Sequence, residues 1–154
     1  MTMKVISGGQ TGADMGGTLS AYAVGLATGG YMPWGYRQEH GHLHNAQVYG
    51  FEQITGGYAN RTMKNVQMAD AVCVFSPVST SPGTELTWAW INYLDKKALD
   101  CTQTQGVEIL EWLQDVRPGV LMVAGNRESK APGLQAHVYE TLMPVFRQIA
   151  ETFA

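Results

Sequence analysis

Apolar positions recur along the chain with two alternating periods. Short runs rich in β-branched and other apolar residues predict buried strands at 3–7, 70–76, 96–102 and 120–125. Apolar residues at i+3 and i+4 steps predict helices over 15–26, 60–68, 84–94, 106–114 and 134–153. We expect Pro144 to kink the last helix. This alternation is typical of an α/β fold with a mainly parallel, doubly wound sheet and helices on both faces.

Residues 29–57 follow neither period, because turn residues, aromatics and histidines interrupt the apolar positions. We interpret them as a long loop with room for one short strand. His40, His42 and His44 would share one face of an extended segment, but without a Cys or carboxylate framework a flexible loop is favoured over a metal site. Trp34 and Tyr36 could stack on a base or act as a lid, or could cover the edge of the core.

Composition narrows the class of protein. A length of 154 residues suits one domain spanning 1–154, and 45% hydrophobic residues with 18 glycines indicate a globular chain rich in turns. A net charge of -3 with 10 Lys and Arg gives no basic stripe, so we expect no nucleic-acid partner. Without a span-length apolar stretch or a signal-peptide pattern, we expect no membrane association and a cytoplasmic location. Cys73 and Cys101 are expected as reduced core thiols.

The segment SGGQTGAD follows the first predicted strand and opens a helix. Glycines allow the backbone to approach an anion, the side chains between them can donate hydrogen bonds, and Asp14 can cap the helix. Ala13 stands where a Walker A lysine would follow the last glycine, and the spacing is not GxGxxG either. A tight turn with a capped helix is the alternative interpretation. The candidate phosphate ligands in this segment are Gly8, Gly9, Gln10, Thr11, Gly12 and Asp14.

Two further polar turns follow predicted strands and precede helices, which places them at the same sheet edge. In SPVSTSPGTELTWAW we expect Thr84 to cap the helix and to face the ligand with the amides beyond Gly83. VAGNRESKAPGL carries the densest charged cluster of the chain, which could supply the positive charge that the first segment lacks or could be solvated loop charge. The candidate ligands in these turns are Pro82, Gly83, Thr84, Asn126, Arg127, Ser129 and Lys130.

Five segments together resemble the putative molybdenum carrier family. They are ISGGQTGAD, TGGYMPWGYRQEHG, YANRTMKNVQMADAVCVF, SPGTELT and VAGNRESKAPGL, in this order over nearly the whole chain. The resemblance implies a Rossmann-like domain of the nucleotide-binding superfamily that also contains the lysine-decarboxylase-like "lonely guy" phosphoribohydrolases and the DNA-processing proteins. It also implies two phosphate loops, at 8–12 and 82–84, with Arg61, Thr62 and Asn65 at the cleft. Arg61 and Asn65 lie one helical turn apart and could face one ligand.

The sequence departs from the phosphoribohydrolases at Thr87, where their catalytic glutamate aligns. A threonine cannot replace a carboxylate in glycosidic cleavage, so we expect a nucleotide-binding carrier, sensor or sequestering protein. The alternatives are a phosphoribohydrolase-type nucleotide hydrolase using Asp14, Glu85 or Glu128, and a scaffold with a vestigial cleft. The cofactor is left open between a nucleotide and a molybdenum-cofactor-like ligand.

Assembly is the last expectation from the sequence. Trp88, Trp90 and Tyr93 crowd one predicted helix and give it more aromatic surface than a core-facing stripe needs. We therefore expect a homo-oligomer, either a dimer or a tetramer.

Overall fold

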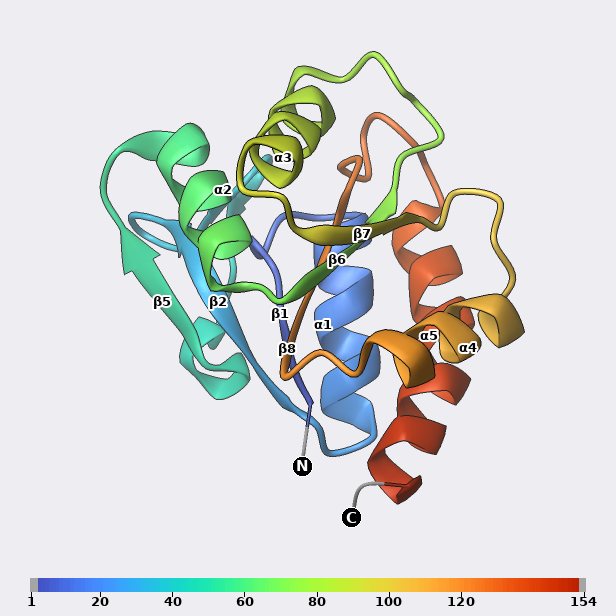
Figure 1. Ribbon diagram of the computed structural model, residues 1–154. Helices are drawn as coiled ribbons and strands as arrows, with labels where there is room; N and C mark the ends of the chain where they lie inside the picture. Colours follow the sequence, from blue (N-terminus) through green and yellow to red (C-terminus); the bar gives the residue numbers. More distant parts are fainter. Residues whose placement is uncertain (1–2, 153–154) are drawn as a thin grey trace.

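Six strands pair in parallel in the order β5-β2-β1-β8-β6-β7 in the computed structural model, which describes residues 3–152. The chain builds outward from β1, crosses to the opposite side of the sheet, and inserts its last strand beside its first (Figure 1). The predicted doubly wound, mainly parallel sheet is thereby confirmed. The strand bounds are β1 Lys4–Ile6, β2 Ala27–Pro33, β5 Phe51–Ile54, β6 Ala71–Phe75, β7 Lys97–Asp100 and β8 Val120–Gly125.

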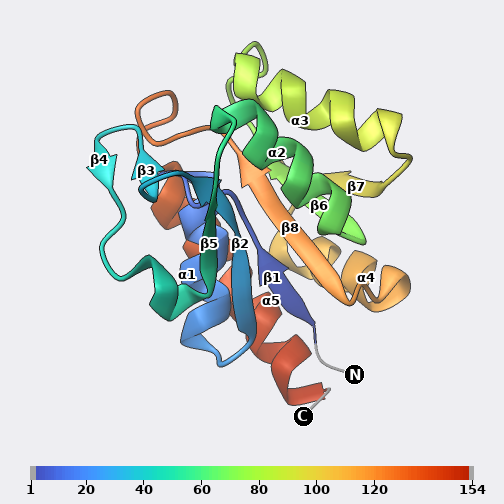
Figure 2. The ribbon, with the colours of Figure 1, turned by 90° about the vertical axis from the view of Figure 1, so that its left-hand side faces the viewer.

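Helices cover both faces of the sheet because alternate strand residues point to opposite sides. Cys73 and Val123 face one apolar cluster, and Val72 and Val74 face the other. The first cluster is covered by α1 (Ala13–Ala23), α4 (Gly106–Val116) and α5 (Leu134–Thr152), and the second by α2 (Gly57–Met68) and α3 (Pro82–Tyr93). Figure 1 and Figure 2 show these two helical layers on either side of the strands.

The interpretation of residues 29–57 as a loop is wrong. Residues 27–33 form β2, which pairs with β1 and β5, and a short hairpin of β3 (Arg37–Gln38) and β4 (Gly41–His42) follows. A 3-10 helix, η1 (Ala46–Tyr49), then leads into β5. Gly30 explains why the strand escapes a pattern search: it has φ +124° and its Cα lies against the Ser7 carbonyl, where a Cβ has no room. Packing therefore selects glycine at a position where propensity disfavours a strand.

Several predicted boundaries move by a few residues. Helix α1 ends at Ala23, so Leu26 is buried outside it, and α2 begins at Gly57 rather than at residue 60.

Cys101 lies just after β7, and both cysteines, Cys73 and Cys101, are buried and free. A hydrogen bond with Cys101, together with burial, raises the pKa of the Cys73 thiol.

The histidine-bearing hairpin is largely exposed. His42 Nδ1 lies 2.7 Å from the Gly35 carbonyl oxygen, and within residues 3–152 no three His, Cys, Asp or Glu side chains are grouped to hold a metal ion. Trp34 is 62% exposed, whereas Tyr36 packs against the small cluster that includes Met32 and Phe51. Tyr36 therefore covers the edge of the core, and Trp34 is left facing solvent.

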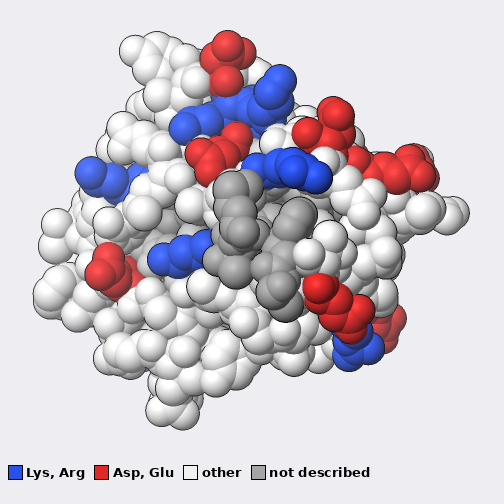
Figure 3. All heavy atoms as spheres, turned by 60° about the horizontal axis from the view of Figure 1, so that its bottom comes forward, with Lys and Arg blue, Asp and Glu red and all other residues white. Residues whose placement is uncertain are grey.

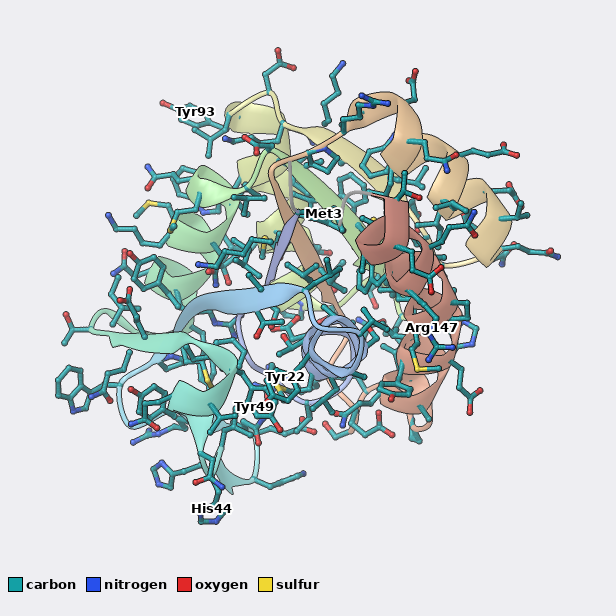
Figure 4. The ribbon with its side chains drawn as sticks, turned by 90° about the horizontal axis from the view of Figure 1, so that it is seen from below. Met3, Tyr22, His44, Tyr49, Tyr93 and Arg147 are labelled. Carbon is teal, nitrogen blue, oxygen red and sulfur yellow. The ribbon has the colours of Figure 1, made fainter. Side chains whose placement is uncertain are left out.

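The outer surface carries exposed aromatic side chains as well as charged ones. Tyr22 and Tyr49 lie side by side with ring centroids 5.0 Å apart (Figure 4), and Tyr93 on α3 is 78% exposed while Trp88 and Trp90 pack against the core. On the face shown in Figure 3, basic and acidic side chains are interspersed. No helix within the described residues is long and apolar enough to cross a bilayer. The expected oligomer stays a prediction, and Tyr93 with its edge contact to Trp90 is the exposed part of that aromatic surface.

Candidate functional site

Three loops meet at the carboxyl ends of β1, β8 and β6, which are neighbours at the centre of the sheet. We call residues 7–12 the first loop, 76–81 the second and 126–133 the third. The first and third are joined where the Ala13 amide donates to the Asn126 carbonyl at 3.1 Å. At the upper left of Figure 2 the β3–β4 hairpin lies beside the third loop. This is the sheet edge at which doubly wound folds bind ligands.

The amides of the first loop already have partners within the protein. Gly9 N–H donates to Ser7 Oγ, Gln10 N–H to Asp14 Oδ2, and Thr11 N–H to Gln10 Oε1, over 3.0–3.2 Å. Gly12 N–H donates to the side chain of Gln135 on α5 at 3.0 Å. A phosphate could bind these amides only by displacing side chains, so the loop holds the protein's own acceptors in the position expected for an anion.

The glycines of this loop leave room for other parts of the protein. A Cβ on Gly8 would collide with the guanidinium of Arg61, and a Cβ on Gly9, which has φ +72°, would meet Met32 Sδ at 2.5 Å. Gly12 has φ +84° and lies against the backbone of the third loop. A Cβ added to Gly12 would lie 2.7 Å from the backbone nitrogen of Glu128. Close internal packing therefore requires the glycines, whatever ligand binds nearby.

Arg61 and Asp14 form a buried ion pair behind the first loop. Arg61 Nη1 lies 3.6 Å from Asp14 Oδ2, and the two side chains are 11% and 7% exposed. Burial raises the pKa of Asp14 to about 6 against the opposing effect of Arg61, and burial likewise lowers the pKa of Arg61 against the opposing effect of Asp14. Removing one partner of such a pair leaves an uncompensated buried charge, at a cost of about 3–5 kcal/mol.

Arg61 keeps one buried donor unused. Its Nε is buried, and nothing in the described part of the chain accepts a hydrogen bond from it. Its guanidinium also lies 5.3 Å from the ring centroid of Tyr58, a cation–π contact. A buried donor without a partner among residues 3–152 is uncommon in a folded protein.

A cavity of about 80 Å³ opens beside this pair. It lies between the first loop, α2, the start of α3 and the end of β8, and its side chains are mostly polar. Thr87 lines it and donates a hydrogen bond to the Gly83 carbonyl at 3.0 Å. Its lining residues are Gln10, Asp14, Tyr58, Arg61, Thr62, Ser81, Gly83, Leu86, Thr87, Met122, Ala124, Gly125 and Arg127.

Asn126 ties the second loop to the third. Its side chain accepts from Val78 N–H at 2.8 Å and donates to the Val78 carbonyl at 3.0 Å and to Thr84 Oγ at 3.3 Å. Thr84 is therefore not the helix cap that we expected, because α3 begins at Pro82 with Ser81 in the N-cap position. Asp14 is likewise inside α1, whose N-cap is Gly12, and it binds the amide preceding that helix instead of capping it.

The other predicted ligands lie in different surroundings. Asn65 is fully buried and its amide group pairs with the backbone of Tyr31, at 2.8 and 3.0 Å, which anchors α2 to β2 and turns Asn65 away from Arg61's cavity. Lys130 is exposed on the third loop. Glu128 accepts from the amides of Gly133 and Gln135 at the start of α5, and this use as a helix-start acceptor explains it without catalysis.

Glu39 is the residue that the sequence did not single out. From the hairpin turn it reaches between the first and third loops, where its carboxylate accepts from Thr11 Oγ at 2.8 Å and from Ser129 N–H and Oγ at 3.1 and 2.6 Å. Arg127 Nε lies 3.8 Å from the same carboxylate, which is 5% exposed. Burial alone would raise the pKa of Glu39, but the hydrogen bonds from Ser129 and Thr11 outweigh it and lower the pKa.

The comparisons with known proteins agree with this architecture. The profile of the circularly permuted YpsA SLOG family matches residues 5–146. The chain belongs to this family. A crystal structure titled putative molybdenum carrier protein, from Syntrophus aciditrophicus SB, superimposes with a TM-score of 0.83 at 28% identity, over 94% of each chain. None of the curated proteins matches the chain. The resemblance drawn from the five segments is thus confirmed for the family and for its Rossmann-like fold.

Proposed function

We propose that this SLOG-family chain binds a phosphate-bearing nucleotide or nucleotide-derived small molecule at the cavity beside Arg61. The observation that carries the proposal is the buried Nε of Arg61, a donor with no acceptor among the described residues, at the wall of a polar cavity. Its guanidinium would form charge-assisted hydrogen bonds with a phosphate oxygen. The exposed part of Tyr58, beside the same guanidinium, would offer an aromatic face to a base.

The role would be carriage, sensing or sequestration. The neighbour's title adds a molybdenum-bearing compound to the candidate ligands, since it calls that protein a putative molybdenum carrier protein. Without a grouped set of metal-ligating side chains in residues 3–152, such a compound would be held through its anionic groups.

We favour binding without turnover because the family resemblance aligns Thr87 with the glutamate of the phosphoribohydrolases, and Thr87 lines the cavity. A nucleotide hydrolase is the second candidate, and a specific observation favours it. Of the described residues that line this cavity, Asp14 is the one with a carboxyl group, and burial raises its pKa to about 6, within the range that suits a general acid or base. Glu85 is exposed on the outer side of α3 and Glu128 is used at the start of α5, so neither competes with Asp14.

The test is a melting-temperature screen with nucleoside monophosphates, nucleoside diphosphates and NAD-derived nucleotides, together with mass spectrometry of small molecules released from the purified protein. A ligand at about one hundred times its Kd should stabilise the fold by about 2.7 kcal/mol. Arg61→Met should remove this stabilisation, whereas Arg147→Met, a matched change at an exposed arginine of α5, should leave it intact. A stabilisation that survives in Arg61→Met would place the ligand elsewhere.

A further inference from the structure

The donors around Glu39 have the composition of an anion-binding site. One hydroxyl comes from Thr11, a hydroxyl and an amide come from Ser129, and a guanidinium comes from Arg127. These groups belong to the loops after β1 and β8, at the centre of the sheet, whereas Glu39 enters from a hairpin outside it. Hydroxyls, an amide and an arginine are also the groups that bind phosphate and sulfate in proteins.

Glu39 and Arg127 separate two cavities. Arg127 lines the cavity beside Arg61, and Glu39 lines a second cavity of about 570 Å³ together with Thr11 and Ser129. Burial has the largest effect on the pKa of Arg61 and lowers it, and Arg127 is close enough to lower it further. A ligand that passes between these two side chains from one cavity to the other would break the ion pair between Glu39 and Arg127.

We propose that Thr11, Arg127 and Ser129 form a second anion subsite, which Glu39 fills from within the chain and which an anionic group of the ligand fills when Glu39 withdraws. The ligand class rests on the proposed function: a molecule with two separated anionic groups, one at Arg61 and one at this subsite. A compound with a single phosphate would reach Arg61 alone. Glu39 thus selects for ligands whose second anion competes successfully with a carboxylate already in place.

The hairpin is built so that such an exchange is local. Its strands β3 and β4 are two residues each, and most of it is exposed. Besides the contacts of the Glu39 carboxylate, two hydrogen bonds attach the hairpin to the first loop. Gln38 Nε2 donates to the Gly9 carbonyl at 2.7 Å, and Glu39 N–H donates to Gln10 Oε1 at 2.8 Å. Withdrawal exposes the carboxylate to water while the incoming anion takes over its donors, so no buried group is left unpaired.

The test uses sulfate as the probe, because it is an anion without a base or sugar. Melting temperatures are measured against sulfate concentration at constant ionic strength in chloride, for the wild type, Glu39→Ala and Glu39→Ala/Arg127→Gln. Removing the internal competitor should raise the apparent sulfate affinity by about tenfold or more, since the subsite is then free in every molecule. The added Arg127→Gln should cancel this gain. Glu111→Ala, an exposed acid on α4, makes the same change in net charge and should gain nothing.

The outcomes separate this proposal from the proposed function. In Glu39→Ala/Arg61→Met the increase in apparent sulfate affinity should persist, because the second subsite does not include Arg61. A loss of binding at Arg61 can therefore be told apart from a failure of the subsite. A Glu39→Ala protein that gains no sulfate affinity, or keeps its gain without Arg127, would overturn the proposal. If Glu39→Ala unfolds in chloride, folding restored by sulfate in this variant but not in Glu39→Ala/Arg127→Gln supports the subsite, because sulfate also stabilises folded proteins without binding to them. Glu39→Gln is a second variant, which removes the charge but keeps the length of the side chain. If neither Glu39→Ala nor Glu39→Gln folds in sulfate, Glu39 is a structural residue and the proposal fails.

Discussion

Sulfate binding at Arg61 should strengthen as the pH falls, because the neighbouring carboxyl of Asp14 then becomes neutral. Burial raises the pKa of Asp14 to about 6, and its ionised form lies 3.6 Å from the guanidinium that the anion would bind. An anion and an ionised Asp14 compete for the same positive charge. The same raised pKa means that Asp14 favours folding most at low pH, and that this contribution is lost as the pH rises from about 4 to about 6.

The size of the effect follows from the fraction of neutral Asp14. With a pKa of about 6, about one molecule in thirty carries a neutral Asp14 at about pH 7.5, and about nine in ten do so at about pH 5. If sulfate binds only the neutral form, its apparent affinity rises by about thirtyfold across this range, or about 2 kcal/mol. Sulfate keeps its charge throughout, and Glu39 stays ionised because its pKa is lowered.

Isothermal titration or sulfate-dependent melting at several pH values measures this change. Asp14→Asn is neutral at every pH, so it should bind sulfate with little pH dependence and with an affinity close to that of the wild type at low pH. Circular dichroism checks that the variant is folded, since it leaves Arg61 without its charged partner. An equally steep pH dependence in Asp14→Asn would refute the reasoning and assign the titration to another group.

The remaining predictions concern packing and turnover. Gly12→Ala should lower the free energy of unfolding, measured in urea, by at least about 2 kcal/mol, because Gly12 has φ +84° and its Cβ would meet the backbone of the third loop. Gly83→Ala should change that free energy by less than about 0.5 kcal/mol, because a Cβ there would have nothing within 4 Å. Asn126→Ala removes three side-chain hydrogen bonds and should lose about 2–4 kcal/mol; an unchanged midpoint would mean that the second loop is held by other contacts. Nucleoside monophosphates should release no free base by chromatography because Thr87 lacks a carboxylate. Release that disappears in Asp14→Asn would make the protein a hydrolase.

The sequence was informative where strand ends carry their own signals. Glycine and polar residues after apolar runs located all three loops at one sheet edge, because parallel strands place their carboxyl ends together. It was uninformative for β2, whose residues ATGGYMP lack β-branched alternation. That strand forms because the backbones of β1 and β5 pair with it on both sides, and Gly30 is required by contact with Ser7.

The interior of the site depended on contacts between distant positions. The first loop was expected to offer free amides, but Gln135 from α5 satisfies one of them and Asp14 satisfies another. Glu39 lies in a segment without periodicity, and no local motif marks a carboxylate that will meet residues ninety positions further along the chain. Arg61 came from the family resemblance, whereas its unsatisfied Nε follows only from the packing around it.

The position of β8 beside β1 has a consequence for how such chains can be rearranged. Strand β1 begins and helix α5 ends at the same end of the molecule (Figure 1), and α5 packs against the helix that follows β1. A covalent link at that end of the molecule, with a new opening in a distant surface connection, would keep every strand neighbour and all three loops in place while changing their order of synthesis. A circular permutation of this kind would therefore leave the cavity beside Arg61 unchanged. Relatives of this chain are better sought by the spatial order of strands than by the linear order of motifs.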